Sequence, residues 1–199
     1  MTDSTRITPP TYPARPINGG PLNRPMPKPG DWAYEPKYNE WRTLIHVPTG
    51  TMFNRHNEPF SIAAEFSPAL ERLKSSPFEW LDCGANERRH DAGRCSLIVF
   101  DAPLVPGSYE VRRRLIEKNF TRLWPKYLPV EDAVYCSFSL PMNAEAALGF
   151  YELLRSLNKQ FGFDFYEGIV AKRIDAAYPL QLISGEQETP AWVKHRWAY

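Results

Sequence analysis

The apolar residues of this chain come in short runs, and the run at residues 97–100 is long enough for one buried strand and no more. Further runs that predict strands recur at residues 41–47, 51–55, 78–85, 95–101, 133–138, 169–173 and 192–197. Helical spacing of apolar residues predicts helices at residues 63–73, 109–124 and 143–161. Because the helices interrupt the strands irregularly, we expect an α+β fold with largely antiparallel sheets.

The composition argues against several classes of protein. No apolar run approaches the roughly 20 residues of a membrane span, and the first ten residues lack the apolar block of a secretory signal. Cys83, Cys95 and Cys136 are an odd number and form no C-x-x-C pair, which argues against a disulfide framework and a structural zinc site. These features predict a reduced, cytoplasmic protein without a membrane partner.

Charge and proline are unevenly distributed along the chain. Residues 1–30 hold eight of the 20 prolines and carry a net charge of +3, whereas residues 31–199 carry −2. A segment of this composition buries little apolar surface, so we expect residues 1–30 to be an extended, mobile arm and residues 31–199 to be the folded domain. The arm could reach a phosphate backbone or act as a solubilising tail.

Three short strings hold most of the candidate chemistry. Residues 35–42 read EPKYNEWR, residues 165–173 read FYEGIVAKR and residues 192–197 read WVKHRW. A lone lysine is usually a solvated surface residue. Lys37, however, lies between aromatic neighbours just before an apolar strand, and Arg42 follows five positions later. Partial burial beside another cation would lower the pKa of Lys37 and make its amine a nucleophile.

Strand alternation sorts the other two strings by face. Alternation puts Glu167 on the face opposite to Val170 and Lys172. Lys194 and Arg196 share one face of the last strand. Two cations on one face repel each other, and a bound phosphate would relieve that repulsion.

Together these strings resemble the covalent nucleotidyltransferases, and most closely the phage-type ATP-dependent DNA ligases. In that superfamily a lysine within K-x-D-G-x-R attacks the α-phosphate of ATP, and later strings read E-G-[IV]-[VI]-x-K and W-x-K-x-K. Lys37 with Arg42, residues 167–172 and residues 192–196 fit these three strings. Three intermediate strings fit in the same order, namely Phe53-Asn54-Arg55-His56-Asn57, Leu81-Asp82-Cys83-Gly84 and Phe100-Asp101. The resemblance covers residues 31–197.

The resemblance implies a fold and a reaction. The fold would be an ATP-grasp-like nucleotidyltransferase domain, with two largely antiparallel sheets packed with helices. In the reaction, Lys37 would expel pyrophosphate from ATP and become lysyl-AMP. AMP would then pass to a 5′-phosphate at a nick in duplex DNA, and a 3′-hydroxyl would displace AMP and seal the strand. Positioning and charge neutralisation would carry these displacements at phosphorus.

The resemblance also implies roles for individual residues. Lys194 and Arg196 would hold the α-phosphate with Lys172 nearby, and Glu167 would bind the catalytic Mg²⁺. Arg42 and Arg55 would bind the nick phosphate or orient the nucleotide. Phe100 and Val170 would sandwich the adenine, although a Phe and a Val on strands fit a plain core equally well. The nucleotide-binding set implied in this way is Glu35, Lys37, Arg42, Arg55, Phe100, Glu167, Val170, Lys172, Lys194 and Arg196.

Three positions depart from the family pattern. Asn39 stands where the family carries Asp, Glu40 stands where it carries Gly, and Gly84 stands where it carries a Glu that contacts the nucleotide and supports metal binding. Glu87 is close in sequence to that missing acid. Strand alternation, however, points the Glu87 side chain to the face of the strand opposite to position 84, unless a bulge intervenes.

The departures leave other functions open. One is a catalytically impaired descendant that binds nucleotide or nicked DNA. Another is an RNA ligase or capping-type nucleotidyltransferase. DNA ligases of this family usually continue into an OB-fold domain that closes over the nick, and because this sequence stops at Tyr199 we expect no OB-fold domain. We expect the basic arm together with the helix bearing Arg112, Arg113 and Arg114 to compensate, or a separate protein to do so, or the full reaction not to occur. The compartment implied is a bacterial or phage-infected cytoplasm.

Overall fold

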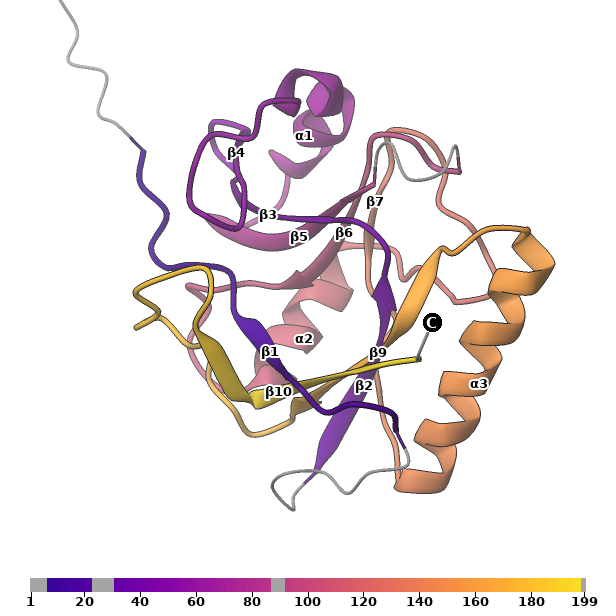
Figure 1. Cartoon of the computed structure of the whole chain (residues 1–199). Coiled ribbons are helices and arrows are strands. Elements are labelled where there is room, and N and C mark those ends of the chain that lie inside the picture. The colour runs from indigo at the N-terminus through magenta and orange to yellow at the C-terminus, as the bar shows by residue number, and fades with distance from the viewer. Residues whose placement is uncertain (1–6, 23–30, 87–91, 198–199) are drawn as a thin grey trace, which may run out of the picture.

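The computed structural model describes residues 7–22, 31–86 and 92–197, and these residues form two five-stranded sheets with helices packed against them. The first sheet has the order β1-β10-β9-β2-β8 and contains β1 (Arg15–Asn18), β2 (Trp32–Tyr38), β8 (Leu140–Pro141), β9 (Tyr166–Arg173) and β10 (Glu188–Arg196). The second has the order β4-β3-β5-β6-β7 and contains β3 (Trp41–His46), β4 (Thr51–Phe53), β5 (Trp80–Asn86), β6 (Ser96–Asp101) and β7 (Val134–Cys136). Figure 1 shows the chain passing from β2 directly into β3, so the link between the sheets is short.

The strand pairings confirm the expected α+β class. Most neighbouring strands are antiparallel, whereas β1 with β10 and β6 with β7 are parallel. Each sheet has its own apolar core. One core joins β3, β5 and β6 to the 3-10 helix η1 (Ala63–Phe66) and helix α1 (Ser67–Leu73), and the other joins β2, β9 and β10 to α3 (Ala144–Phe161). No helix within the described segments is both long and apolar enough to cross a lipid bilayer.

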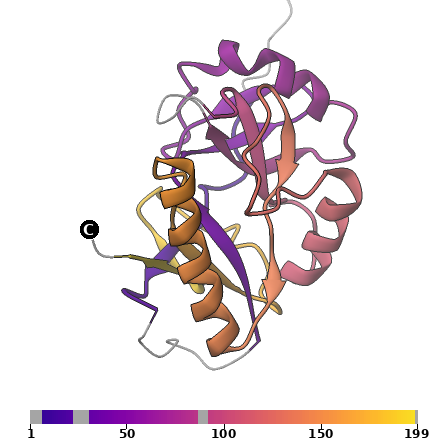
Figure 2. The ribbon, with the colours of Figure 1, turned by 90° about the vertical axis from the view of Figure 1, so that its right-hand side faces the viewer.

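Helix α3 forms where its sequence predicts it. The Asn143 side chain accepts a hydrogen bond from the Ala146 amide, and Gly162 ends the helix in a left-handed conformation with φ 80°. Buried residues at helical spacing, among them Leu154 and Leu157, turn one face toward the first sheet. Figure 2 shows this helix running along that sheet.

Helix α2 (Tyr109–Asn119) is shorter than the predicted helix at residues 109–124, because the backbone becomes extended at Phe120. The expectation that its three arginines are available to a nucleic acid is wrong at two of the three positions. Arg112 is fully buried and Arg113 nearly so, which leaves Arg114 as the exposed arginine of the three. A buried Arg112 serves the interior of the protein and offers no charge to a nucleic acid.

Strand β2 was missed by the sequence analysis, which placed Lys37 just before the first strand of the domain. Lys37 lies within β2, and Pro36 precedes it in the same strand. Proline lacks an amide donor and is tolerated at sheet edges. Strand β8 pairs only with Ala33 and Tyr34, so the part of β2 around Pro36 has that edge open.

The expected extended, mobile arm differs from the structure at the residues described before Asp31. Strand β1 (Arg15–Asn18) pairs with β10, and the Gly19 amide donates to the Lys194 carbonyl. The Asn57 side chain donates to the Thr11 carbonyl, which fixes the segment further upstream. Residues 1–6 and 23–30 of the expected arm lie outside the described residues.

Candidate active site

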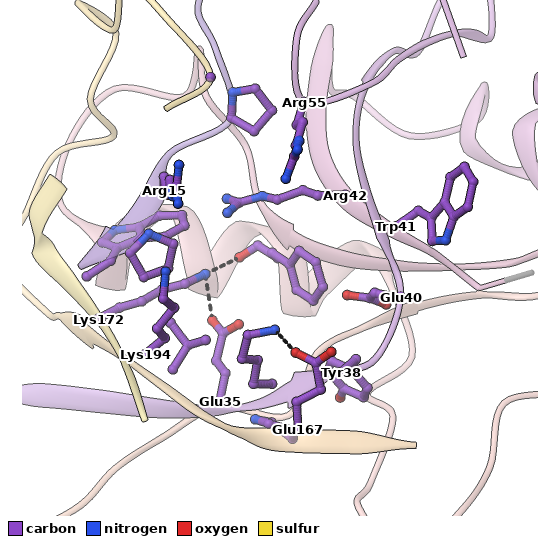
Figure 3. A pocket seen from close by; sticks show the side chains of 18 of the residues that line it. Arg15, Glu35, Tyr38, Glu40, Trp41, Arg42, Arg55, Glu167, Lys172 and Lys194 are labelled. Atoms are coloured by element: carbon purple, nitrogen blue, oxygen red, sulfur yellow. Dashed lines mark hydrogen bonds and ion pairs between the residues drawn. The ribbon is translucent and has the colours of Figure 1, made fainter. Parts of the chain in front are cut away.

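One cavity of about 750 Å³ receives side chains from both sheets (Figure 3). All ten residues of the nucleotide-binding set expected from the sequence line this cavity: Glu35, Lys37, Arg42, Arg55, Phe100, Glu167, Val170, Lys172, Lys194 and Arg196. They come from β2, β3, β6, β9, β10 and the loop after β4. The structure therefore brings together residues that are spread over 162 positions of the sequence, from 35 to 196.

Lys37 and Glu167 form an ion pair in the cavity, and a bulge in the sheet brings them together. In the β2–β9 ladder Lys37 lies opposite Gly168, whereas Tyr38 lies opposite Tyr166. Glu167 is thus the extra residue of a β-bulge, and Gly168 beside it has φ 145°. The alternation expected for β9 is wrong at Glu167, because the bulge turns this side chain to the same cavity as Val170 and Lys172.

The Lys37 amine is in an environment suited to a nucleophile. Burial lowers its pKa, the Glu167 carboxylate raises it, and the nearby Arg196 guanidinium lowers it, with a net downward shift. A lysine with a lowered pKa loses its proton more readily near neutral pH, so its nitrogen lone pair becomes available for attack.

Lys172 is held in a buried network at the inner wall of the cavity. Its ammonium lies 2.9 Å from the Glu35 carboxylate and donates to the Phe100 carbonyl at 3.1 Å. The same ammonium lies 4.2 Å from the centre of the Trp192 ring. The Tyr109 hydroxyl also donates to Glu35. Lys172 and Glu35 therefore form a fixed charge pair within the wall.

Strand β10 brings two cations to the cavity, as the sequence predicts. The Lys194 side chain is mostly buried, and burial lowers its pKa with a further contribution from Arg15. The Arg196 guanidinium lies 3.1 Å from the Glu167 carboxylate and is half exposed. These cations, with Arg15 from β1, surround a volume that suits a polyanion.

Arg42 is anchored more firmly than the sequence suggests. Its Nε and Nη2 donate to the two Asp82 carboxylate oxygens at 2.8 and 2.5 Å, and its Nη1 donates to the Ala14 carbonyl at 2.5 Å. The fully buried Asp82 also accepts a hydrogen bond from the Tyr178 hydroxyl at 2.6 Å. Arg42 thus joins the segment that contains Ala14 to β5. Arg55, by contrast, has an exposed side chain at the rim.

Phe100 and Val170 present apolar surface to the cavity. Both are partly exposed, whereas their strand neighbours Val99 and Ile169 are fully buried. The Phe100 ring also stacks on the Tyr38 ring at a centroid distance of 6.0 Å. This geometry suits a planar ring packed against them.

The three departures from the ligase-like pattern have distinct surroundings. Asn39 does not line the cavity, and its side-chain amide donates to the Asp164 carbonyl at 3.1 Å, a bond that a carboxylate could not donate. Glu40 does line the cavity. Gly84 lies in β5 opposite Arg42, and a Cβ atom at this glycine would overlap the Glu40 carboxylate. Glu87 lies outside the described residues.

The donor set fits both a nucleotide triphosphate and a divalent cation. Clustered cations around the cavity suit phosphate oxygens, and 750 Å³ is within the usual range for a small-molecule site. The Glu167 carboxylate supplies oxygen ligands of the type that Mg²⁺ prefers, and Mg²⁺ is commonly held by one or two carboxylates together with substrate phosphates.

The sequence analysis missed two charged residues of the cavity, Arg15 and Glu40. The sequence did offer a reason to consider Glu40, because this residue replaces a glycine in the ligase-like string. It offered none for Arg15, since nothing in residues 1–30 indicates a strand that pairs with residues 188–194.

Comparison with known proteins supports the fold. No family model matches the sequence, and no curated protein sequence matches it significantly. A mycobacterial DNA ligase D complexed with ATP and MES superposes with a TM-score of 0.61 at 19% identity, over 94% of this chain and 60% of that one. The Chlorella virus DNA ligase-adenylate gives 0.59 at 12% identity over 92% and 68%, and an archaeal ATP-dependent RNA ligase gives 0.55 at 16% over 94% and 48%.

At these identities the likeness shows a shared fold. The chain spans 60% of the length of the ligase D structure, so the comparison concerns one part of that enzyme. The described residues of this chain have the fold of the nucleotidyltransferase domains of DNA and RNA ligases.

Proposed function

We propose that this protein is a ligase-like adenylyltransferase in which Lys37 carries AMP. The observation that carries the proposal is the position of the Lys37 amine, which has a lowered pKa, pairs with Glu167 and lines a cavity rich in cations. The fold shared with ATP-dependent ligases supports ATP as the substrate.

In the first step, the Lys37 Nζ lone pair attacks the α-phosphorus of ATP. A P–N bond forms, the bond to the pyrophosphate oxygen breaks, and Nζ gives up a proton. Glu167 lies beside that nitrogen and is placed to orient it. Lys194 and Arg196 neutralise charge on the phosphoryl oxygens, and Phe100 and Val170 hold the adenine.

A bound Mg²⁺ would neutralise phosphate charge, and Glu167 would hold it. In the second step an oxygen of a 5′-phosphate attacks the same phosphorus, the P–N bond breaks and Lys37 regains its amine. In the third step a 3′-hydroxyl attacks the activated 5′-phosphate, AMP leaves and the strand is joined. We propose nicked duplex DNA as the acceptor, with RNA as the alternative.

The test is the intact mass of the purified protein before and after incubation with ATP and Mg²⁺. We expect an adenylyl increment on the wild type and none on Lys37→Ala. Lys37→Arg is the matched control, because it keeps a cation beside Glu167 while removing the nucleophilic amine. An unmodified wild type at saturating ATP would refute the proposal.

A second candidate is a protein that binds nucleotide or nicked DNA without catalysis. The position of Asn39 favours it, because this residue supplies no carboxylate and does not line the cavity. It predicts DNA binding that weakens steeply with salt and no mass increment. If an increment is found, sealing assays on nicked DNA and nicked RNA then identify the acceptor.

A further inference from the structure

Glu40 and Gly84 share one space in the cavity wall. Glu40 lies in the short link between β2 and β3, and Gly84 lies in β5. A Cβ atom built on Gly84 would overlap the carboxylate carbon and both carboxylate oxygens of Glu40. The Glu40 carboxylate therefore occupies the place that a side chain at position 84 would take.

Gly84 is needed for space and not for its backbone conformation. Its φ is outside the left-handed region, and it pairs regularly with Arg42 on one side and Ile98 on the other. A glycine inside a strand weakens the sheet and often marks the close approach of another group. Here the approaching group is a carboxylate. The ligase-like pattern places the acid at position 84 and the glycine at position 40, and this chain carries the two in reverse.

The Glu40 carboxylate has a buried oxygen that remains available for a ligand. Its Oε2 is buried and has no hydrogen-bond partner among the described residues. A buried carboxylate oxygen without a donor is costly and is normally satisfied by a hydrogen bond. Burial raises the pKa of Glu40 well above its ordinary value, although the positive charges of Lys37 and Arg42 oppose that rise, and a hydrogen-bond donor from a ligand would favour the ionised form. Figure 3 shows the carboxylate directed into the cavity.

We propose that Glu40 binds the sugar of the nucleotide by accepting a hydrogen bond from a ribose hydroxyl. This inference rests on the proposed function, because it needs a nucleotide in the cavity. If the base packs on Phe100 and the α-phosphate meets Lys37, the sugar lies between them. Glu40 is placed near both: it interacts electrostatically with Lys37 and with Tyr38, whose ring stacks on Phe100.

The charge of the carboxylate favours a hydroxyl over the other parts of a nucleotide. Phosphate oxygens are repelled by a carboxylate, and the apolar faces of the base suit Phe100 and Val170. A ribose hydroxyl is a neutral donor that can satisfy Glu40 Oε2. A hydrogen bond to a charged group contributes about 1.5–3 kcal/mol, which corresponds to an affinity difference of roughly tenfold or more.

The experiment compares equilibrium binding of AMP, 2′-deoxy-AMP and 3′-deoxy-AMP by calorimetry in the presence of Mg²⁺, because these nucleotides carry no pyrophosphate leaving group and cannot react with Lys37. We expect the wild type to bind AMP about tenfold or more tightly than one of the deoxynucleotides. In Glu40→Ala that preference should disappear, so that both nucleotides bind equally. Glu71→Ala is the matched control, because Glu71 is an exposed acid on α1 and does not line the cavity.

Several outcomes would overturn the inference. One is a wild type that binds the three nucleotides equally, and another is a Glu40→Ala variant that keeps the preference. A variant that weakens all nucleotides equally and needs more Mg²⁺ would show that Glu40 holds the cation instead. A wild type that binds no nucleotide would refute both the inference and the proposed function. Discrimination without a mass increment would support Glu40 while refuting adenylyl transfer.

An exchange of the two residues tests the shared space. Gly84→Glu places two carboxylates in one position, so we expect weaker nucleotide binding and a lower Tm. The double variant Glu40→Gly with Gly84→Glu should recover both, because a single carboxylate again fills the space from β5. A double variant whose nucleotide affinity and Tm are no higher than those of Gly84→Glu alone would contradict the inference that the two side chains share one space. Where Gly84→Glu does not fold, the comparison is between Glu40→Gly and the double variant.

Discussion

Lys37 on β2 and Glu167 on β9 form an ion pair because the bulge at Gly168 removes Glu167 from the regular alternation of its strand. In an unbroken ladder, Glu167 would point to the opposite face from Val170 and Lys172. The bulge therefore decides whether the amine has a carboxylate beside it.

The first prediction concerns pH. The amine of Lys37 reacts only when deprotonated, and burial lowers its pKa, so reactivity should rise with pH and reach its midpoint below that of an ordinary lysine. The Glu167 charge raises the pKa of Lys37, so Glu167→Gln should move the midpoint to lower pH still. The measurement is the rate of labelling of Lys37 by an amine-specific reagent, followed by mass spectrometry against pH without nucleotide.

Glu110→Gln serves as its control, because Glu110 is exposed and pairs with Arg114 away from the cavity. This change should leave the midpoint where it is. An upward shift in Glu167→Gln would contradict the role assigned to Glu167.

The second prediction concerns the bulge itself. Gly168 has φ 145°, and a Cβ atom there would overlap the His195 carbonyl oxygen of β10. Gly168→Ala should therefore cost about 1–3 kcal/mol of stability from backbone strain alone and weaken nucleotide binding by displacing Glu167. The measurement is urea unfolding together with calorimetry.

Gly149→Ala offers a matched comparison. Gly149 lies within α3, and a Cβ atom there meets nothing within 4 Å. Because alanine is the better helix former, this change should stabilise the protein by about 0.8–1.0 kcal/mol. Equal effects of the two substitutions would show that the bulge carries no strain.

The third prediction concerns the arginines of α2. Arg112 and Asp101 are both fully buried and lie 2.6 Å apart, so Arg112→Ala leaves an unpaired buried carboxylate. The expected loss is about 3–5 kcal/mol in the free energy of unfolding. Arg114→Ala, at an exposed position of the same helix, should change stability by no more than about 0.5 kcal/mol. Urea denaturation of both variants gives the comparison.

The fourth prediction concerns Arg15. It lines the cavity and lowers the pKa of Lys194, so its positive charge acts in the cavity even though it also forms ion pairs with Glu186 and Glu188. Arg15→Ala should lower the affinity for ATP several-fold, with a larger effect at low salt than at high salt. The measurement is the dissociation constant of ATP at two ionic strengths. An affinity that is the same as in the wild type at low salt would place the phosphates away from β1.

The elements with strong local patterns were predicted well from the sequence. Asn143 and Gly162 mark the ends of α3, and both act as the sequence predicts. The ligase-like strings also identified ten residues that line one cavity, because the order of such strings reflects the order of strands that build it.

The features that were missed depend on contacts between distant segments. Strand β1 has no pattern of its own and exists because the edge of β10 is open to it. The bulge at Gly168 requires a comparison of the registers of two strands. From the sequence alone Arg112 looks like a surface cation, because nothing local indicates that β6 places Asp101 beside it.

The pairing of β1 with β10 has a consequence for how the protein is made. These strands join residues 15–18 to residues 188–194, so nearly the whole described chain lies between them. Closing so long a loop is slow and entropically costly, which places this step late in folding. On the ribosome, β1 emerges early and stays without a partner until β10 has been synthesised. The wall that contains Arg15 is thus assembled last, so under the proposed function only a fully folded chain would bind the nucleotide.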